Sequence, residues 1–419
     1  MSEKKRILIL TADAGFGHRS AANAILSALE KNHGEECECH ILNPIEDKRA
    51  PFFLRDSGAD YDHLIRTAPQ LYRLGYEASD NDIPTQIMET ALTLSLYEIM
   101  QDMVKEYNPD AIVTTYPLYQ APLISYFKLN KYYVPLLTVV TDLVSVHRIW
   151  FSPGVNQCLV PTTDVKALAI KHDVAQSRIH ITGIPVSPDF KLKKRNKKEM
   201  RKELGWDPNL PTFLAVGSQR VDQLVEMLNV INHFGIKLQV VAVAGKDEEL
   251  FSELNKIEWH IPAHVYDFVE NMPELMMASD AIICKAGGLI VTESLACGLP
   301  ILLIDVIPGQ EEGNRDYVVE QGAGAMIDSP MQMLETLSHW VTDGEKKLRQ
   351  VSSNSRRVGK PNSALEVANY AWRAALRGPV NKRGRSGLGL PRLMELLTRH
   401  NIPWVKEPAE AKETQNENK

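Results

Sequence analysis

Short apolar runs alternate with amphipathic stretches along almost the whole chain. The apolar runs have the length of buried β-strands, and the stretches between them have the three- to four-residue repeat of a helix face. Such alternation predicts parallel sheets whose faces are covered by helices. The runs predicted as strands are residues 7–11, 38–42, 111–115, 136–141, 158–161 and 179–183 in the first half, and 212–216, 238–244, 265–268, 281–284, 301–304 and 324–327 in the second.

The strand candidates form two successive series, which predicts two doubly wound α/β domains. A chain of 419 residues is long enough to build two cores. The series meet at a turn-rich segment, residues 183–188, which is followed by a basic run. We therefore expect an N-terminal domain at 1–186, a basic linker at 187–202, a second domain at 203–360, C-terminal helices packed back on the first domain at 361–400, and a disordered tail at 401–419.

Charge, apolar runs and cysteine content limit the binding partners and the cellular compartment that we expect. The net charge is −6, which does not suit a protein that coats nucleic acid. No run reaches the roughly 18 apolar residues of a membrane helix, and the first apolar run predicts a strand rather than a signal peptide. Five cysteines without framework spacing favour a reducing compartment. We expect a cytoplasmic protein.

Two basic segments raise the question of a membrane contact. Residues 191–202 contain eight basic residues and one acidic residue, and residues 377–400 are basic with spaced leucines. The first segment is either a contact for anionic lipid or, as we favour, a solvated helix start beside the linker. The second is either an interfacial helix or a helix docked on the body of the protein.

A glycine-rich turn that ends in histidine follows the first predicted strand. Gly15 and Gly17 allow a tight turn and a close backbone approach by a ligand, with Phe16 between them. His18 then stands at a helix start beyond the carboxyl end of a strand, where open α/β sheets bind ligands. A neutral imidazole there can take a proton from a hydroxyl, and Asp13 is a candidate to orient it. A polar residue at a helix start explains the same pattern equally well.

A second glycine pair, Gly287 and Gly288, stands between a predicted strand and a predicted helix. The free N–H groups of Gly288, Leu289 and Ile290 would face a phosphate, and no metal is then required to hold a diphosphate. Glu293 lies one turn into the helix and could accept hydrogen bonds from two ribose hydroxyls. The alternative is that the glycines only allow the helix to pack on the sheet.

The next predicted strand ends in a polar loop. The loop presents Gln310, Glu311 and Asn314, a cluster of amide and carboxylate groups. Such a cluster suits a sugar, whose hydroxyls both donate and accept hydrogen bonds. A solvated acidic loop is the weaker interpretation because the cluster lies beside the phosphate turn in strand order. The sequence therefore predicts a nucleotide-sugar site in the second domain.

In the first domain, residues 141–153 follow an apolar strand and should face the same cleft. Asp142 is expected either to pair with His18 or to bind a hydroxyl of an acceptor substrate. His147 and Trp150 are candidates to line the acceptor site. Core packing is the alternative for this aromatic segment, and we favour it for Phe151.

Together these segments resemble the monogalactosyldiacylglycerol synthase family, whose relatives include processive diacylglycerol glucosyltransferases and, more distantly, MurG-type enzymes. The matching motifs follow one another in the family order from about residue 6 to residue 327. They are Gly15-Phe-Gly-His18, the Thr-Asp-Leu block from Thr141 to Pro153, Gly183-Ile-Pro185, Asp267-Phe-Val-Glu-Asn-Met272, the segment from Lys285 to Pro300 and that from Gly309 to Asn314.

The resemblance implies a GT-B fold and an inverting, metal-independent transfer of a hexose from UDP-galactose or UDP-glucose to diacylglycerol or a similar lipid. It implies no cofactor, and it places the protein peripherally on the anionic inner face of the cell membrane. Residues 61–79 would face the acceptor. On the family pattern the catalytic residues are His18 as the base and Asp142; the donor-binding residues are Gly217, Ser218, Phe268, Val269, Gly288, Leu289, Ile290, Glu293, Gln310, Glu311 and Asn314; and the acceptor-binding residues are Gly15, Phe16, Gly17, His147 and Trp150.

Two departures from the family pattern bear on the substrates. Phe16 stands where the family turn has another glycine, and residues 216–222 contain one glycine where relatives have a glycine-rich loop. Either Ser218 or Arg220 substitutes in that loop, or the geometry of the bound donor differs from that in the family. The competing hypotheses are a transferase that uses UDP-N-acetylglucosamine, a sugar-nucleotide 2-epimerase on the same fold, and a non-catalytic protein that binds UDP-sugar or lipid.

Overall fold

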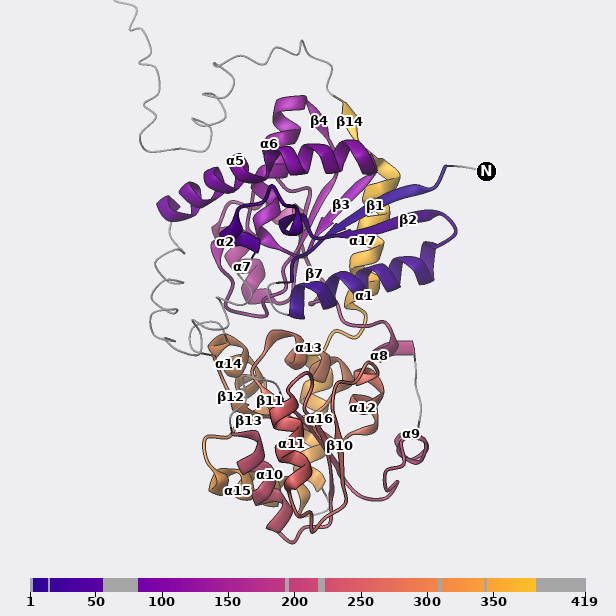
Figure 1. Cartoon of the computed structure of the whole chain (residues 1–419), viewed down its shortest axis with the longest axis vertical. Coiled ribbons are helices and arrows are strands. Elements are labelled where there is room, and N and C mark those ends of the chain that lie inside the picture. The colour runs from indigo at the N-terminus through magenta and orange to yellow at the C-terminus, as the bar shows by residue number, and fades with distance from the viewer. Residues whose placement is uncertain are drawn as a thin grey trace, which may run out of the picture.

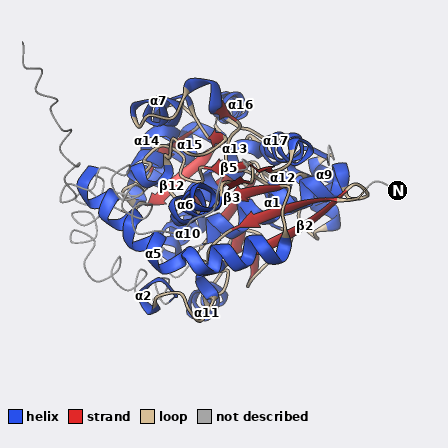
Figure 2. Cartoon of the chain, turned by 90° about the horizontal axis from the view of Figure 1, so that it is seen from above, coloured by secondary structure: helices blue, strands red, loops and turns tan. Residues whose placement is uncertain are grey.

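The computed structural model describes residues 3–13, 16–55, 82–192, 196–217, 223–307, 311–342 and 345–381. In these residues the chain forms two six-stranded parallel sheets, one in each half of the molecule (Figure 1). Helices lie on both sides of the strands when the molecule is seen from above (Figure 2). The α/β fold with two doubly wound sheets, predicted from the alternation of apolar runs and helices, is confirmed.

The first sheet has the strand order β2-β1-β3-β5-β6-β7. Residues of β1 alternate between its two faces, because successive side chains of a strand point in opposite directions. Ile7 and Ile9 pack on one face with α1 (Phe16–His33) and α17 (Ser363–Arg377), and Leu8 and Leu10 on the other with α5 (Asp82–Tyr107) and α6 (Gln120–Asn130). Burial on both faces explains why the sequence of such a strand is a continuous apolar run. The six strands are β1 (Lys5–Leu10), β2 (Cys37–Leu42), β3 (Ala111–Thr114), β5 (Leu136–Val139), β6 (Gln157–Val160) and β7 (Ile179–Ile181).

The second sheet has the order β10-β9-β8-β11-β12-β13. Phe213 and Ala215 of β8 pack with α10 (Leu224–His233) and α15 (Pro330–Val341), whereas Leu214 packs with α12 (Met272–Ala278) and α13 (Gly288–Cys297). Each sheet therefore has its own pair of cores. The six strands are β8 (Thr212–Val216), β9 (Gln239–Val243), β10 (Ala263–Tyr266), β11 (Ala281–Lys285), β12 (Ile301–Asp305) and β13 (Gly324–Met326).

Shorter elements connect and cover these sheets. Two short strands, β4 and β14, pair antiparallel, which brings the end of the described chain back to the first half. The remaining elements are η1 (Pro44–Glu46), α2 (Phe52–Arg55), η2 (Pro117–Tyr119), β4 (Tyr132–Tyr133), η3 (Arg148–Trp150), α7 (Thr163–Lys171), η4 (Gln176–Arg178), α8 (Asp189–Leu192), α9 (Lys197–Glu203), α11 (Glu248–Lys256), α14 (Glu312–Glu320), α16 (Lys346–Val358) and β14 (Val380–Asn381).

The described part of the chain crosses between the two halves twice, and the two crossings touch. The first crossing follows β7, and the second joins α16 to α17, which packs on the first sheet. The backbone N–H of Val186 donates a hydrogen bond to Ser363 Oγ at 3.1 Å. Gly183 has a φ of +84°, and a Cβ placed on it would lie 2.6 Å from Lys360 Cβ. Glycine is therefore required here both for its backbone conformation and for the close approach of the second crossing.

Gly183→Ala should lower the free energy of unfolding by about 2–4 kcal/mol, because left-handed backbone strain and overpacking add at this residue. The matched control is Gly205→Ala, since Gly205 has a φ of +76° but a Cβ placed on it would have nothing within 4 Å. That control should lose only about 1–2 kcal/mol, the cost of the strain. Urea unfolding midpoints measure both, and equal losses in the two variants would contradict the close contact.

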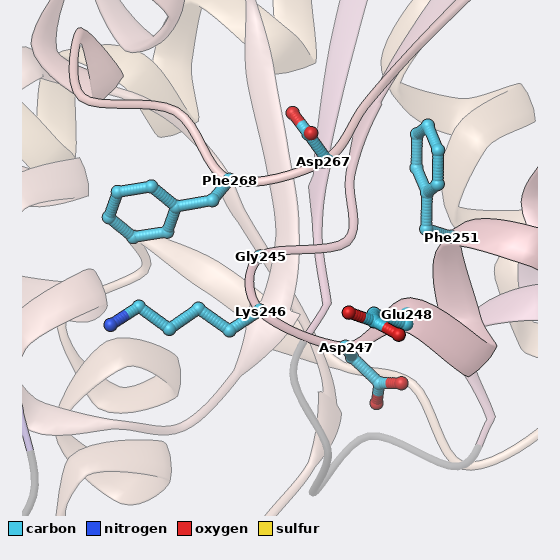
Figure 3. A pocket seen from close by; sticks show the side chains of 7 residues that line it. All are labelled: Gly245, Lys246, Asp247, Glu248, Phe251, Asp267 and Phe268. Carbon is cyan, nitrogen blue, oxygen red and sulfur yellow. The ribbon is translucent and has the colours of Figure 1, made fainter.

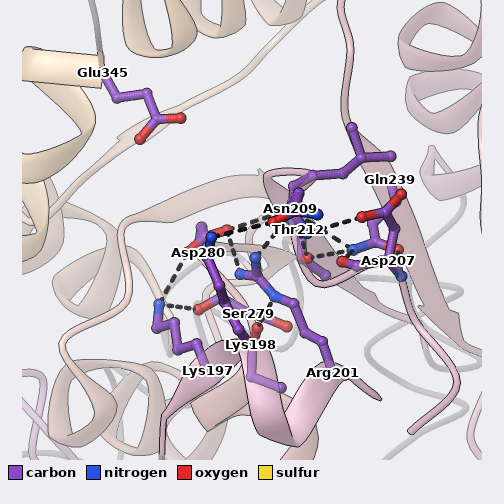
Figure 4. A network of polar contacts seen from close by, with 12 residues as sticks. Lys197, Lys198, Arg201, Asp207, Asn209, Thr212, Gln239, Ser279, Asp280 and Glu345 are labelled. Atoms are coloured by element: carbon purple, nitrogen blue, oxygen red, sulfur yellow. Dashed lines mark hydrogen bonds and ion pairs between the residues drawn. The ribbon is translucent and has the colours of Figure 1, made fainter.

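The basic run at residues 191–202 has a structural role that the sequence did not reveal. Lys197 donates to the Ser279 carbonyl oxygen and to Asp280 (Figure 4). Arg201, a residue only 5% exposed, donates through its guanidinium group to Asp280 and to the carbonyl oxygens of Ala278 and Leu210. These two cations therefore fasten α9 to the loop before β11. The expectation of a solvated helix start is wrong for Arg201, which is buried, whereas the Lys197 side chain is ion-paired but stays 39% exposed. The side chains of residues 191–195 lie outside the described residues.

Candidate functional site

The carboxyl ends of the two sheets face each other, and one segment of the first half, residues 141–145, makes contact between them. Residues 141–145 follow β5, and Leu143 is buried among side chains of the second half. Ser145 approaches so closely that a Cβ on Gly313 would lie 2.3 Å from its Oγ. The ends of β1, β3 and β5 are thereby brought against the starts of α13 and α14.

His18 lies in the first turn of α1, directed at the end of β3. Its Nδ1 is 2.9 Å from the Thr115 carbonyl oxygen and 2.8 Å from Thr141 Oγ1. A carbonyl oxygen can only accept, so the proton of the neutral ring belongs on Nδ1, and the lone pair is left on Nε2. Tyr116 and Trp150 pack near the ring, with centroids 5.0 and 6.0 Å from it.

Burial also sets the charge of this histidine. Removal from water disfavours the imidazolium and lowers the pKa of His18 to about 4, against the opposing effect of the Thr115 carbonyl. At neutral pH His18 is therefore an uncharged ring whose Nε2 lone pair is available to accept a proton, as a general base requires.

The carboxylates predicted to assist His18 have other partners. Asp142 Oδ2 accepts a hydrogen bond from Trp150 Nε1 at 2.7 Å, and burial raises the pKa of Asp142 to about 6. Asp13 forms an ion pair with Arg19 at 2.8 Å. The expected Asp142–His18 pair is thus not formed in this structure, because the neighbouring Thr141 occupies that place. An acceptor contact is the alternative left to Asp142.

The predicted acceptor residues divide into buried and open ones. His147 is 8% exposed and accepts a hydrogen bond from the Ile149 backbone N–H, and Trp150 is only 2% exposed. Trp150 holds Asp142 through its indole N–H and packs near the His18 ring. Gly17 is open among the described acceptor candidates, since no described atom outside its chain neighbours lies within 4 Å of a Cβ placed on it. Gly15, the Phe16 side chain and residues 61–79 lie outside the described residues.

The glycine pair that was predicted to bind phosphate lies on the other side of Thr141 from His18. Helix α13 begins at Gly288, its N-cap is Gly287, and no side-chain hydrogen bond caps it. The N–H groups of Gly288, Leu289 and Ile290 are first-turn donors of the kind that bind anions. A Cβ on Gly288 would lie 3.7 Å from the Thr141 carbonyl oxygen. Thr141 therefore bonds to the histidine through its hydroxyl, and its carbonyl oxygen lies beside Gly288.

Glu293 lies one turn further along α13. Burial raises the pKa of its carboxyl group to about 8, and no opposing charge offsets that effect. A carboxyl group enclosed in this way is poised to exchange hydrogen bonds with a ligand that brings its own polar groups. The two hydroxyls of a ribose would meet that need.

The polar loop after β12 is more enclosed than the sequence indicates. Glu311 and Asn314 are each 5% exposed, and Asn314 Nδ2 donates to the Ala286 carbonyl oxygen at 2.9 Å. The Glu311 carboxylate accepts hydrogen bonds from Lys285 Nζ at 2.5 Å and from the Ile307 N–H at 3.0 Å. Glu311 was expected to hold a hexose, but both of its oxygens have protein partners here. Gln310 lies outside the described residues.

A pocket of about 300 Å³ opens at the carboxyl ends of β9 and β10 (Figure 3). Phe268 is 53% exposed, and its ring lies 5.3 Å from Lys246 Nζ, with both side chains projecting to the same side. Val269 packs on the core beside it. Gly217 directly follows β8, and a Cβ placed on it would lie 2.3 Å from Leu250 Cδ2 and 2.9 Å from Leu224 Cδ2. Ser218 lies outside the described residues. An exposed aromatic ring at such an edge is suited to stack on a nucleobase.

Sequence reasoning missed three residues of this site. Thr115 contributes only a carbonyl oxygen, so its side chain gave no signal. Thr141 begins the motif at residues 141–153, but the residue predicted there to pair with His18 is its neighbour Asp142. Lys285 gave a usable signal, since it is a cation directly before a glycine pair at a strand end.

Comparisons with known proteins identify this arrangement. Residues 18–186 match the profile of monogalactosyldiacylglycerol (MGDG) synthase, and residues 212–368 match the glycosyltransferase family 28 C-terminal domain. Monogalactosyldiacylglycerol synthase 1 of Arabidopsis thaliana, a chloroplastic protein, is 33% identical over 377 residues, which cover 87% of this chain and 70% of the relative.

Solved structures agree on the fold. MurG of Acinetobacter baumannii superposes with a TM-score of 0.58 at 15% identity, over 88% of this chain and 100% of MurG. HepE of Anabaena in complex with UDP superposes with a TM-score of 0.53 at 12% identity, over 90% of this chain and 100% of HepE. The two facing sheets are those of a GT-B glycosyltransferase. Within that class, the chain belongs to the monogalactosyldiacylglycerol synthase family.

Proposed function

We propose that this glycosyltransferase moves a hexose from UDP-galactose or UDP-glucose to diacylglycerol or a similar lipid, with inversion and without a metal. The observation that carries the proposal is the position of Thr141, whose hydroxyl bonds to His18 and whose carbonyl oxygen lies beside Gly288. This residue brings a candidate base close to a helix start that is suited to bind an anion. A base on one side and a phosphate site on the other leave the sugar between them. Relatives named for monogalactosyldiacylglycerol support the lipid acceptor.

The donor would lie along the second sheet. Its uracil would stack at Phe268, with Lys246 alongside, and its ribose would bind Glu293. The diphosphate would bind the N–H groups at the start of α13, whose dipole favours negative charge. HepE, which has the same fold, is known in complex with UDP. Asn314, beside Gly288, is the described residue of the polar loop best placed to reach the hexose.

The reaction follows from the position of Nε2. The acceptor hydroxyl attacks the anomeric carbon from the side opposite the diphosphate, its proton passes to His18 Nε2, and the bond to the UDP oxygen breaks. A single displacement of this kind inverts the anomeric centre. A neutral imidazole with a lowered pKa can accept the proton at pH 7, and the Thr115 carbonyl keeps the ring oriented.

We also propose that the protein acts peripherally at a lipid surface. Among the described residues no helix is long and apolar enough to cross a membrane. Exposed apolar side chains on α2 and α5 supply a surface for lipid: Phe52 and Leu94 are each 68% exposed, and Ile87 is 46% exposed. Ile87 and Leu94 are seven residues apart, which places them on one face of the helix. Flotation with anionic vesicles tests this, and a protein left at the bottom of the gradient would contradict it.

The function is tested with UDP-galactose, UDP-glucose and UDP-N-acetylglucosamine, each with diacylglycerol vesicles and with vesicles lacking it. We expect a monohexosyl lipid by mass spectrometry, formed only with diacylglycerol and at an unchanged rate in excess EDTA. Loss of activity in EDTA would refute the metal-independent mechanism. Turnover of UDP-N-acetylglucosamine without any acceptor would indicate an epimerase. UDP binding without turnover would indicate a binding protein.

A further inference from the structure

We propose that Lys285 is a catalytic residue, whose ammonium group binds the donor diphosphate and stabilises the departing UDP, and that Glu311 is the positioning residue that holds it there. The proposal rests on the proposed function, since it assumes a nucleoside diphosphate donor. It gives Glu311 a part other than the sugar contact expected from the sequence.

The first observation is the ion pair itself. Lys285 Nζ lies 2.5 Å from Glu311 Oε1, and the two side chains are 19% and 7% exposed. The other carboxylate oxygen of Glu311 accepts the Ile307 N–H at 3.0 Å, which fixes the orientation of the carboxylate. Burial of an ion pair is costly and contributes little net stability. An enclosed pair at the edge of a ligand site is therefore better explained by function than by stability.

The second observation is where the ammonium group lies. Lys285 is the last residue of β11, and the pairing with β12 shifts by one residue between Cys284 and Lys285. Gly287, the N-cap of α13, packs against the pair, because a Cβ placed on it would lie 3.3 Å from Lys285 Cε and 3.5 Å from Glu311 Oε1. The ammonium group and the free N–H groups of α13 thus flank the same glycine.

The proposed reaction requires positive charge beside the departing diphosphate. When the bond to the anomeric carbon breaks, its electron pair passes to the β-phosphate oxygen, and the diphosphate gains negative charge. The start of α13 supplies about half a positive charge. An ammonium group supplies a full charge and has three N–H donors, so it can contact a phosphate oxygen while it remains bound to Glu311. Before the donor arrives, the Glu311 carboxylate balances the charge of Lys285.

The test compares two variants that both lack the ion pair and differ in the ammonium group. Glu311→Gln keeps Lys285, and the double variant Lys285→Met/Glu311→Gln replaces the pair by neutral side chains, which avoids an unpaired buried carboxylate. Calorimetric titrations with UDP and with uridine measure the preference for the diphosphate. We expect this preference to fall about 10- to 100-fold from the single to the double variant, the usual effect of one hydrogen bond to a charged group. Uridine affinity should stay the same.

Further measurements separate this role from a structural one. Lys285→Arg keeps a cation and should retain most of the preference for UDP over uridine. The double variant should also lose kcat by more than it raises KM for the donor, because the cation acts most strongly on the departing phosphate. An unchanged preference in the double variant, or equal losses of UDP and uridine affinity, would overturn the role of Lys285 while leaving UDP as the donor. Failure of the unaltered protein to bind UDP would instead remove the donor assignment and this inference with it.

Discussion

Replacing His18 with alanine should lower kcat by about 10²- to 10⁴-fold, the usual contribution of a general base, and should leave KM for the UDP-sugar within about twofold. The reason is geometric. Nδ1 is held by the Thr115 carbonyl oxygen and by Thr141, so the available lone pair is on Nε2. Steady-state kinetics with diacylglycerol vesicles measure both constants. Full activity in the alanine variant would remove His18 from the mechanism.

His18→Gln is the matched variant for this prediction. A glutamine amide can still donate to the Thr115 carbonyl oxygen but takes up no proton, so it separates orientation of the loop from base catalysis. We expect its kcat to be as low as that of the alanine variant, with a melting temperature close to that of the unaltered protein. A glutamine variant with high activity would indicate that His18 only supports the turn.

The pH profile gives an independent check. Because burial lowers the pKa of His18 to about 4, the ring is neutral through the physiological range, and kcat/KM should fall only as the pH drops below about 5. The unfolded histidine binds its proton near pH 6.5, so the folded protein loses stability as the pH falls from about 6.5 to 4. His18→Gln should remove that part of the acid sensitivity.

Glu293→Gln should weaken UDP binding about 10- to 100-fold, because the ribose hydroxyls lose a carboxylate acceptor. In the free protein burial raises the pKa of Glu293 to about 8, so the carboxyl group is mostly protonated at pH 7. Binding through the carboxylate must then release a proton, and UDP affinity should rise with pH until about 8. Calorimetry in buffers of different ionisation enthalpy counts the released protons. The glutamine variant should lack this proton release.

The same substitution should stabilise the free protein at high pH. A carboxyl group whose pKa is raised in the folded state costs stability as the pH rises from its unfolded value, about 4.5, through about 8. Glu293→Gln should therefore raise the melting temperature at pH 8.5 and leave it nearly unchanged at pH 4.5. Weaker UDP binding together with higher stability is the signature of a binding residue. A fall in both would indicate that Glu293 supports the fold.

Much of the fold was accessible from the sequence because parallel strands buried on both faces give continuous apolar runs. The runs at 7–11 and 212–216 correspond to β1 and β8. Glycine turns at strand ends also predicted that His18 and Gly288 would lie at the carboxyl edges of the sheets. Those edges are where a doubly wound fold places a ligand. Local signals of this kind require no knowledge of distant contacts.

The hydrogen-bond and ion-pair partners of the site residues could not be predicted from the sequence, because these pairs depend on distances between segments that are remote along the chain. Thr141 and Asp142 are adjacent, and only the path of the loop after β5 decides that the hydroxyl reaches His18 while the carboxylate reaches Trp150. In the same way, Arg201 was interpreted as a solvated cation, although its partner Asp280 lies 79 residues away. Sequence patterns identify the elements that meet, and side-chain packing then selects the pairs.

The most direct test of the whole account is the anomeric configuration of the lipid product. The protein would be incubated with a UDP-hexose labelled with ¹³C at the anomeric carbon and with diacylglycerol vesicles, and the extracted lipid examined by NMR. A base on one face of the sugar and a diphosphate site on the other predict a β-linked hexosyl lipid from the α-linked donor, formed at least about 100-fold more slowly by His18→Gln. An α-linked product, or the same β-linked product at full rate from His18→Gln, would contradict the account.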